Sequence, residues 1–486
     1  MPNRATRATR ALSAPLAAVL ILTAAIPSAP AQRGVGTQQT AATEHEQIVQ
    51  QFGGELGGPL GQLVDSIASR ITAQARGRIN PDFTLLNSPV ANAFATPSGR
   101  VYVTRQLLAL MNSEDELAFV LGHEAGHVAA NHSRERQRGS LVSQILSGLA
   151  GAITGSDVAT QAVGLLAQGQ LASFSRNQEL ESDRLGIRYM AANGYNPTQS
   201  AEILETLDAY GRLQARFSGR EDDQRSAPSW FSTHPTSERR VAQIRREAQA
   251  SGRGQSPTAR DRYLSMIDGM IFDDDPRQGI VEGRTFSHPD LRLAFDAPQG
   301  YGIQNGTSAV TVSGAQGQAI FSSLPGGYAG DLEQYAVAAL RRHLGQAQVQ
   351  ASPPRRTTIN GIPAVLVQAQ SRTRSGVVDL TVMAYEFSRN QAYYIASLTQ
   401  GRGFAAFEPM IGSVRRLTDR EAAAIRPRVI DIATVGPRDT VETLARRMAY
   451  STYQVERFRV LNGLTSGEGL QPGQRVKLVV YGSPVR

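Results

Sequence analysis

The sequence FVLGHEAGHVAANH places three of the chain's seven histidines within ten residues. Two of them, His123 and His127, are four positions apart, and side chains at this spacing on a helix lie one turn apart, with Cβ atoms ~5–6 Å from each other. Both imidazoles could therefore bind one metal ion, while Glu124 would project beside them towards a metal-bound water. The alternative is a helix that carries these polar residues without a chemical role.

A catalytic zinc site needs a third protein ligand and keeps its fourth position for water. The chain contains no cysteine, so that ligand must be a histidine or a carboxylate. Glu179 and Asp183, in the sequence ELESD, are four residues apart and face the same way on a second predicted helix. One could bind the metal while the other accepts the ring N–H of a ligand histidine and fixes its tautomer. The alternative is a solvated acidic helix face.

The histidine pair and the carboxylate pair are each expected to lie on a helix. Ser113 with Glu116 three residues later is a capping box, which predicts a helix that begins near Glu114 and ends at Gly139. The second helix is predicted to end at the Asn-Gly pair at 193–194.

Two further segments of this region have their own patterns. Alternation after the turn signal at 97–99 predicts a short strand at 101–104. Residues 140–172 are rich in small and apolar residues, which favours helices packed over the core, with a membrane-touching lid as the alternative.

The motifs NAFATPSGRVYVTRQLL, LGHEAGHVAANH, SRNQELESDRLG and WFSTHPTSERR, in this order, resemble HtpX-like and CAAX-prenyl-endopeptidase-type zinc metallopeptidases, which are gluzincins. The resemblance covers residues 45–250 and is greatest to secreted or periplasmic members. It implies a mainly α, zincin-type domain with a short edge strand. It also implies one Zn²⁺ per chain, bound by His123, His127 and Glu179.

The same resemblance implies roles for the neighbouring residues. Asp183 would orient a ligand histidine, and Arg240 would pair with the ligand carboxylate. His234 would lie over the metal as an oxyanion donor or as a removable fourth ligand. Glu124 would take a proton from the zinc-bound water and pass it to the leaving amine.

The substrate is expected to be an extended or misfolded polypeptide. Residues Asn92, Ala93 and Phe94 resemble the start of the family's edge strand, which would hold substrate as an added strand through backbone hydrogen bonds. Trp230 is interpreted as a core residue in preference to a substrate contact.

The other histidines are predicted to have no catalytic role. His132 and His343 are interpreted as solvated helix residues and His288 as a turn residue, while His45 has no assigned role.

Beyond residue 250 the composition changes. Residues 251–280 are polar with Gly and Pro and predict a linker. Residues 281–417 predict an α+β domain of unknown role, whose opening FSHPDLRLAFDAPQGYGI resembles PsbP-like domains and implies a fold but no chemistry. A hairpin is predicted around 388–390, and helices at 331–344 and 403–417.

Residues 431–481 predict a strand, a helix capped by Asp439 together with Glu442, a second helix that ends at the Asn-Gly pair at 462–463, and a closing strand. This small β-α-α-β unit resembles a LysM domain, a family that binds N-acetylglucosamine glycans such as peptidoglycan. Arg438 stands where the family usually has glycine.

The N-terminus reads as a secretory signal peptide at 1–31, with a basic segment, an apolar run of about 16 residues and cleavage after Ala31. The run is short of the ~20 residues that a spanning helix needs, so no stable transmembrane anchor is expected. The localisation is therefore predicted to be the periplasm or the exterior. The net charge of +8 falls to +5 without these residues, and no arginine stripe or nucleic-acid motif occurs.

The sequence therefore predicts a multidomain zinc endopeptidase that handles misfolded envelope proteins and is tethered to the wall by its C-terminal unit. One alternative is a hydrolase of peptidoglycan peptides. Another is a non-catalytic glycan-binding or chaperone-like protein.

Overall fold

The computed structural model describes residues 37–73, 82–135, 174–217, 230, 234–235, 238–252, 259–344, 349, 351–373, 376–401 and 404–483. The predicted signal peptide with its cleavage site after Ala31, the segment 140–172 and the predicted helix end at Gly139 lie outside these residues.

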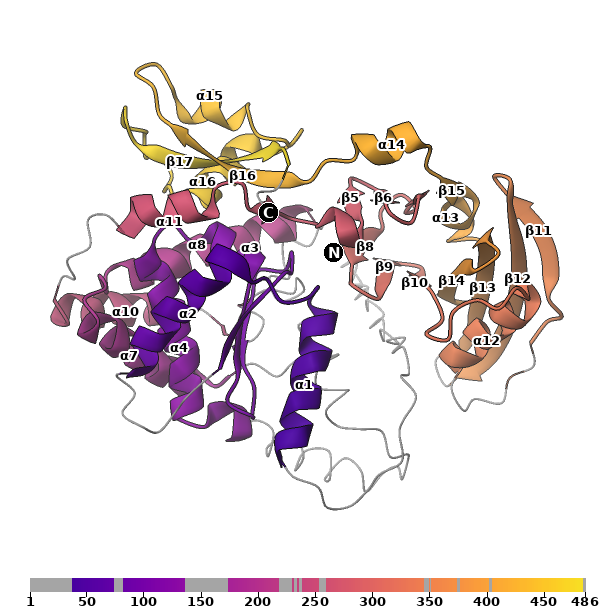
Figure 1. The fold of residues 1–486 in the computed structure, drawn as a ribbon, viewed down its shortest axis with the longest axis horizontal. Helices are drawn as coiled ribbons and strands as arrows, with labels where there is room; N and C mark the ends of the chain where they lie inside the picture. Colours follow the sequence, from indigo (N-terminus) through magenta and orange to yellow (C-terminus); the bar gives the residue numbers. More distant parts are fainter. Residues whose placement is uncertain are drawn as a thin grey trace, which may run out of the picture.

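The N-terminal part is mainly helical and surrounds a small sheet (Figure 1, indigo to magenta). In that sheet the central strand β3 pairs in parallel with β1 and antiparallel with β2, which lies at an edge. Strand β3 confirms the predicted strand at 101–104. The elements are α1 (Thr37–Gln51), α2 (Gly58–Ala73), β1 (Phe83–Leu86), β2 (Ala93–Ala95), β3 (Val101–Thr104), α3 (Arg105–Leu110), α4 (Glu114–Ala129), α7 (Arg176–Ala192), α8 (Gln199–Phe217) and α10 (Glu238–Ala250).

Helix α4 begins at Glu114, as predicted, because the Ser113 hydroxyl accepts the backbone N–H of Glu116 at 3.2 Å. The Glu116 carboxylate accepts the N–H of Asn112 at 2.7 Å, so the predicted capping box is only half formed. The helix ends at Ala129, ten residues before the predicted end, because Asn131 has a left-handed backbone with φ 59°. Helix α7 ends at the predicted Asn-Gly pair, where Gly194 has φ 77°.

The middle part is β-rich and lies beside the helical part (Figure 1, orange). A seven-stranded sheet has the order β11-β12-β13-β14-β10-β9-β8, and a smaller one the order β15-β7-β6-β5. Helix α12 packs on one face of the larger sheet, and the smaller sheet with α13 packs on the other. The elements are β5 (Ile280–Glu282), β6 (Thr285–His288), β7 (Leu293–Asp296), β8 (Gly302–Asn305), β9 (Ala309–Gly314), β10 (Gly317–Ser322), α12 (Leu332–Leu344), β11 (Arg355–Ile359), β12 (Ile362–Thr373), β13 (Gly376–Ser388), β14 (Gln391–Gln400), α13 (Glu408–Ser413) and β15 (Arg415–Arg416).

Two of the three predictions for this part are confirmed. Strands β13 and β14 form the predicted hairpin, and α12 is the first predicted helix. The second predicted helix is shortened to α13, because residues 404–407 form turns before it and a strand follows at Arg415.

The C-terminal part has the predicted β-α-α-β order, formed by β16 (Arg428–Thr434), α15 (Val441–Ala445), α16 (Gln454–Leu461) and β17 (Arg475–Tyr481), and α14 (Asp419–Ala424) precedes it. Thr440, and not Asp439, caps α15, since its hydroxyl accepts the N–H of Thr443. The Asp439 carboxylate instead accepts the N–H of Gly436 at 2.7 Å, within the preceding turn.

The segment predicted as a linker at 251–280 contains packed structure. Helix α11 (Ala259–Ile267) buries Tyr263, Leu264 and Ile267, and β4 (Ile271–Phe272) pairs with β16. These three apolar residues recur at helical spacing, and their burial stabilises a helix in a segment whose polar composition had predicted a linker. The same hydrophobic core contains residues of α2, α4, α8, α16 and β17, so the C-terminal unit is built onto the helical part.

The chain's single lysine joins these two parts. Lys477 of β17 is fully buried, and its ammonium donates to the carbonyls of Ala109 and Met111 at 2.8 and 2.6 Å. Glu116 lies near it; burial lowers the pKa of Lys477 and raises that of Glu116 to about 7. The C-terminal strand is therefore held at the junction between α3 and α4.

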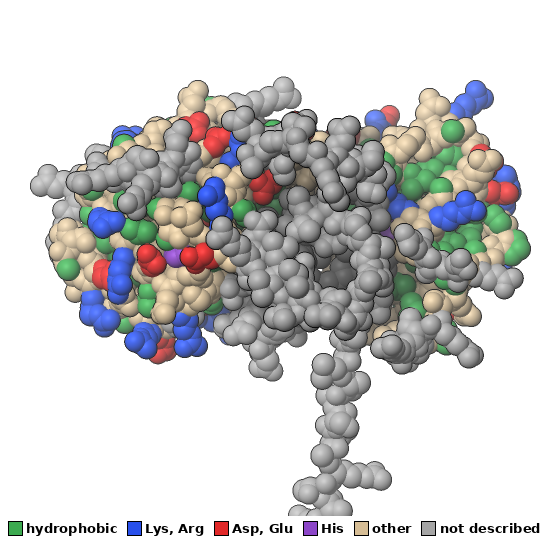
Figure 2. Space-filling view, turned by 90° about the horizontal axis from the view of Figure 1, so that it is seen from below, with side chains coloured by type: hydrophobic (Ala, Val, Ile, Leu, Met, Phe, Trp, Pro, Cys, Tyr) green, Lys and Arg blue, Asp and Glu red, His purple; other side chains and the backbone are tan. Residues whose placement is uncertain are grey.

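The described surface carries no positive stripe on the face seen in Figure 2, where arginine and acidic side chains are interspersed over the helical part at the left. Within the described ranges, none of the helices has the length and hydropathy needed to cross a membrane.

We expect Lys477→Met to lower the free energy of unfolding by about 3 kcal/mol, because it leaves two buried carbonyls without donors and Glu116 without its cation. Urea unfolding followed by circular dichroism measures this loss. Arg438→Ala, at an exposed position of the same unit, is the control and should change stability by less than about 0.5 kcal/mol. Equal stability of Lys477→Met and the native chain would contradict the role of the lysine.

Candidate metal centre

Helices α4 and α7 approach each other closely enough for their side chains to share one site. A Cβ atom at Gly122 would lie 3.1 Å from the Cα of Gly186, and one at Gly186 would lie 3.0 Å from the backbone nitrogen of His123. Gly126 makes a similar contact, since its Cβ would lie 3.1 Å from the Cα of Ser182. Any larger residue at these positions would push the helices apart.

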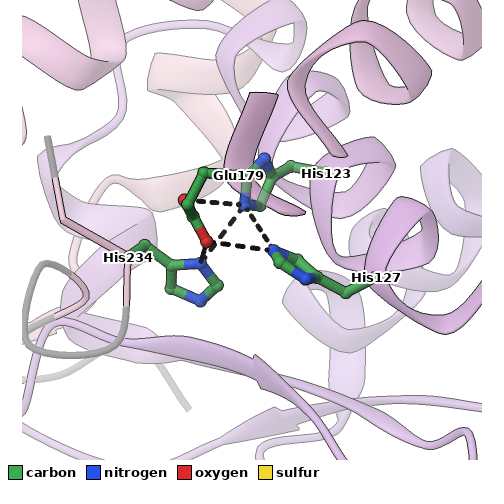
Figure 3. A group of neighbouring side chains, drawn as sticks. All are labelled: His123, His127, Glu179 and His234. Carbon is green, nitrogen blue, oxygen red and sulfur yellow. Dashed lines mark hydrogen bonds and ion pairs between the residues drawn. The ribbon is translucent and has the colours of Figure 1, made fainter. Parts of the chain in front are cut away.

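This crossing brings four candidate ligands together from three segments (Figure 3). His123 and His127 come from α4, Glu179 from the first turn of α7, and His234 from the segment before α10. One ligand atom of each lies within 4.8 Å of all the others, and the four side chains are at most 1% exposed. The two helices thus place the predicted ligands in one buried cluster.

The spacing of these atoms fits a tetrahedral ion. His123 Nε2 is 3.0 Å from His127 Nε2 and 3.2 Å from His234 Nδ1. Glu179 Oε1 is 3.0 Å from His234 Nδ1 and 3.3 Å from His127 Nε2. Ligands bound at ~2.0–2.1 Å to a tetrahedral zinc ion are about 3.3 Å apart, so these four spacings are compatible with one shared ion. His234, predicted to lie over the metal, thus has its Nδ1 among the candidate ligand atoms.

Asp183 and Arg240 lie against the cluster. Asp183 Oδ1 is 2.9 Å from His123 Nδ1, which leaves Nε2 of that ring facing the site. Arg240 donates to both oxygens of Asp183 at 2.7 and 2.8 Å and lies 2.7 Å from Glu179 Oε2. One guanidinium thus holds two buried carboxylates in fixed positions.

The electrostatics of the cluster favour a cation. Burial would raise the pKa of Glu179, but His234 and Arg240 outweigh it and hold the pKa well below the usual range, so the carboxylate stays ionised. Burial alone would lower the pKa of His123, yet Asp183 and Glu179 raise it. Two buried carboxylates against one arginine leave a negative charge, which a divalent ion would balance better than a proton on His123.

Glu124 lies at the edge of the cluster and contacts the segment that carries His234. Its Oε1 accepts the indole N–H of Trp230 at 3.1 Å and lies 3.3 Å from His234 Nε2. Its Oε2 is buried and has no hydrogen-bond partner among the described residues. Trp230 is 1% exposed and stacks on His234, with ring centroids 4.7 Å apart, so it is a core residue that also touches the site.

The predicted substrate residues lie at the edge of the sheet, but their side chains are buried. Phe94 packs between Phe52 and Tyr102, with ring centroids 5.3 and 5.1 Å away, and the Asn92 carbonyl accepts the N–H of Thr104. Only the backbone of this edge could therefore hold a peptide.

That edge already has partners from the chain itself. The Ala91 carbonyl accepts the N–H of Trp230, and the Ala95 carbonyl accepts the hydroxyl of Ser133, both at 3.0 Å. These two carbonyls lie on either side of Ala93, so a bound strand would have to displace the Trp230 segment.

Three of the remaining histidines differ from their predicted roles. His132 is 3% exposed and lies against His127, so it is not a solvated residue. His343 is half-buried and lies 3.2 Å from the hydroxyl of Tyr394, since α12 packs on the sheet. His288 ends strand β6 and accepts the N–H of Leu291 at 3.3 Å. His45 lies 3.1 Å from the Tyr102 hydroxyl.

Phe174 was not singled out in the sequence. Its ring stacks on His127, with centroids 3.9 Å apart. An aromatic residue one position before the cap of α7 has no distinctive sequence signal, because only the crossing of the helices brings it to the site.

Residues 59–248 match the family model described as Peptidase family M48. The buried ligand cluster lies within this matched stretch, which is thus similar to the zinc metallopeptidases of that family.

Two groups of relatives are named as proteases or metalloendopeptidases, in agreement with this similarity. The chain is 30% identical over 223 residues to the Beta-barrel assembly-enhancing protease of Escherichia coli strain K12, an alignment that covers 42% of each chain. It is 30% identical over 188 residues to the Mitochondrial metalloendopeptidase OMA1 of Schizosaccharomyces pombe, which covers 38% of this chain and 52% of the relative. The similarity thus spans about half the length of these relatives or less.

We expect Gly122→Ala to weaken zinc binding by about tenfold and to destabilise the fold by about 1–3 kcal/mol, because its Cβ would push α4 and α7 apart. Competition with a chromophoric chelator measures the affinity, and thermal unfolding measures the stability. Gly211→Ala on α8, where a Cβ would meet nothing within 4 Å, is the matched control. It should leave zinc binding unchanged and stabilise the fold by ~0.5–1 kcal/mol. A loss of stability without any change in affinity would contradict the proposed link between helix spacing and the site.

Proposed function

We propose that this chain is a zinc-dependent endopeptidase that hydrolyses peptide bonds of extended or misfolded envelope proteins. The observation that carries the proposal is the buried set of His123, His127, Glu179 and His234 with Glu124 in contact with it. A structural zinc site would need no carboxylate beside the ligands, whereas hydrolysis needs a base within reach of the attacking water.

Each residue has a defined task in this proposal. His123, His127 and Glu179 hold the zinc ion, which supplies Lewis acidity that lowers the pKa of a water molecule and polarises the substrate carbonyl. Glu124 takes the proton of the attacking water on Oε2, the oxygen without a partner among the described residues, and delivers it to the leaving amine. Asp183 and Arg240 keep His123 and Glu179 in the orientations that the ion requires.

His234 acts as a removable fourth ligand. Its Nδ1 lies 3.2 Å from His123 Nε2 and 3.0 Å from Glu179 Oε1, so it would bind the same ion in place of a water molecule. The same segment contacts Glu124 and the Ala91 carbonyl through Trp230, so its withdrawal would free the base, the coordination position and the sheet edge together. An oxyanion donor would lie further from the ligand atoms, and this favours the ligand role.

The substrate class follows from the edge of the sheet. A strand bound through backbone groups of residues 92–94 would be held with little sequence preference, which suits unfolded or misassembled proteins. One relative is named a Beta-barrel assembly-enhancing protease, and that name is consistent with envelope proteins as substrates. Secretion to the periplasm and a tether to peptidoglycan through residues 431–481 are further parts of the proposal, on the evidence of the N-terminal pattern and the β-α-α-β order.

The assay that tests this function compares casein and purified sacculi as substrates of the zinc-loaded chain. We expect casein cleavage, and Glu124→Gln should lower the rate by at least about a thousandfold while zinc content stays equimolar, because the amide cannot accept the proton. Zinc analysis of the variant is the control for an intact site.

Two outcomes would contradict the proposal. Release of soluble muropeptides without casein cleavage would favour hydrolysis of peptidoglycan peptides. Absence of both activities, with glycan binding retained, would favour the non-catalytic alternative.

Replacement of His234 tests its role as a removable ligand. We expect His234→Ala to raise the initial rate of casein cleavage several-fold, because a coordination position opens for water, and to weaken zinc binding by about tenfold. The rate is measured at saturating zinc. A fall of ~100-fold with zinc still bound would instead identify His234 as an oxyanion donor.

A further inference from the structure

His132 lies directly behind the ligand His127, on the side away from the candidate metal site. The Nδ1 atoms of the two rings are 3.1 Å apart, and the ring centroids are 5.1 Å apart with a tilt of 71°. His132 is 3% exposed, and its Nε2 lies 3.4 Å from the carboxylate of Glu181 on α7. The chain thus buries a further imidazole against one of the four candidate ligands.

A break in the helix produces this contact. His132 is five residues beyond His127, and a continuous helix would rotate it about 140° away from that ring. Asn131 ends the helix with φ 59°, a left-handed conformation that asparagine tolerates better than most residues. Ser133 and Arg134 then fix the new direction by donating to the carbonyls of Ala95 and Pro97 at 3.0 and 2.9 Å.

The direction of the hydrogen bonds follows from the site. His127 directs Nε2 to the other ligand atoms, so its remaining proton belongs on Nδ1. That proton needs an acceptor, and His132 Nδ1 is in place to provide one. His132 must then carry its own proton on Nε2, from which it can donate towards Glu181.

We propose that His132 is a positioning residue that holds His127 in the tautomer and orientation required to bind zinc. The inference rests on the proposed metal site and adds a residue to its support. The arrangement parallels the other ligand imidazole, since Asp183 Oδ1 lies 2.9 Å from Nδ1 of His123.

Asp183 and His132, which contact the two ligand imidazoles from behind, differ in charge. Asp183 is buried and paired with Arg240, whereas His132 is a neutral acceptor whose outer partner, Glu181, is 59% exposed at its side chain. Solvent screens an exposed carboxylate, so Glu181 contributes little and the imidazole itself is the main support.

Zinc affinity, measured by competition with a chelator, tests the role without any reference to activity. His132→Leu removes the acceptor and should weaken binding by ~10–100-fold. His132→Asn places an amide oxygen near the position of Nδ1 and should bind within about threefold of the native chain. Thermal unfolding of the metal-free variants shows whether each one folds, and His45→Asn, at a histidine outside the cluster, should leave affinity unchanged.

A second measurement reports on the native chain and uses a variant only to assign one signal. Two-bond ¹H–¹⁵N correlation spectra of the zinc-loaded native chain report the tautomer of each imidazole, and the signal lost in His132→Asn identifies His132. We expect His132 to be protonated at Nε2 and His127 at Nδ1.

The outcomes separate this inference from the proposed function. Native affinity in His132→Leu, equal weakening by Leu and Asn, or a proton on Nδ1 of His132 would overturn the positioning role. Glu179→Ala tests the metal site itself. If it retained equimolar zinc, the proposed ligand set would be wrong, whereas loss of zinc there together with native binding in His132→Leu would overturn the His132 inference alone.

Discussion

The site depends on the close contact of two helices. Gly122 on α4 meets Gly186 on α7 with no room for a side chain, and this contact sets the distance at which the imidazoles of one helix meet the carboxylate of the other. A zinc ion tolerates deviations of only about ±0.2 Å in its ligand distances. The spacing of the helix backbones is therefore part of the chemistry of the site.

The close contact of α4 and α7 would by itself destabilise the fold, because it buries two carboxylates. Glu179 and Asp183 are each about 1% exposed, and a buried charge without a partner is strongly destabilising. Arg240 bridges both and holds the pKa of each carboxylate below its usual range, although burial acts in the opposite direction. The start of α10, which carries Arg240, is thereby tied to α7.

The parts of the chain beyond residue 250 are also coupled to this arrangement. The hydrophobic core around α4 continues into β16, α16 and β17, and Lys477 reaches the carbonyls that precede α4. The unit that resembles a LysM domain in sequence thus shares a hydrophobic core with the helix that carries His123 and His127. Its position stabilises the start of that helix, whatever else it binds.

The sequence by itself determined the local features: the start of α4, the end of α7, the β13–β14 hairpin, and the spacing that puts His123 and His127 on one helix face. Such features depend on neighbours a few residues apart. Only the tertiary structure decided the rest, including the place of His234 among the candidate ligands, the contact of His132 with His127 and the packing of α11 in the predicted linker. Each of these depends on contacts between distant segments or on a single left-handed residue, Asn131, which a helical pattern does not encode.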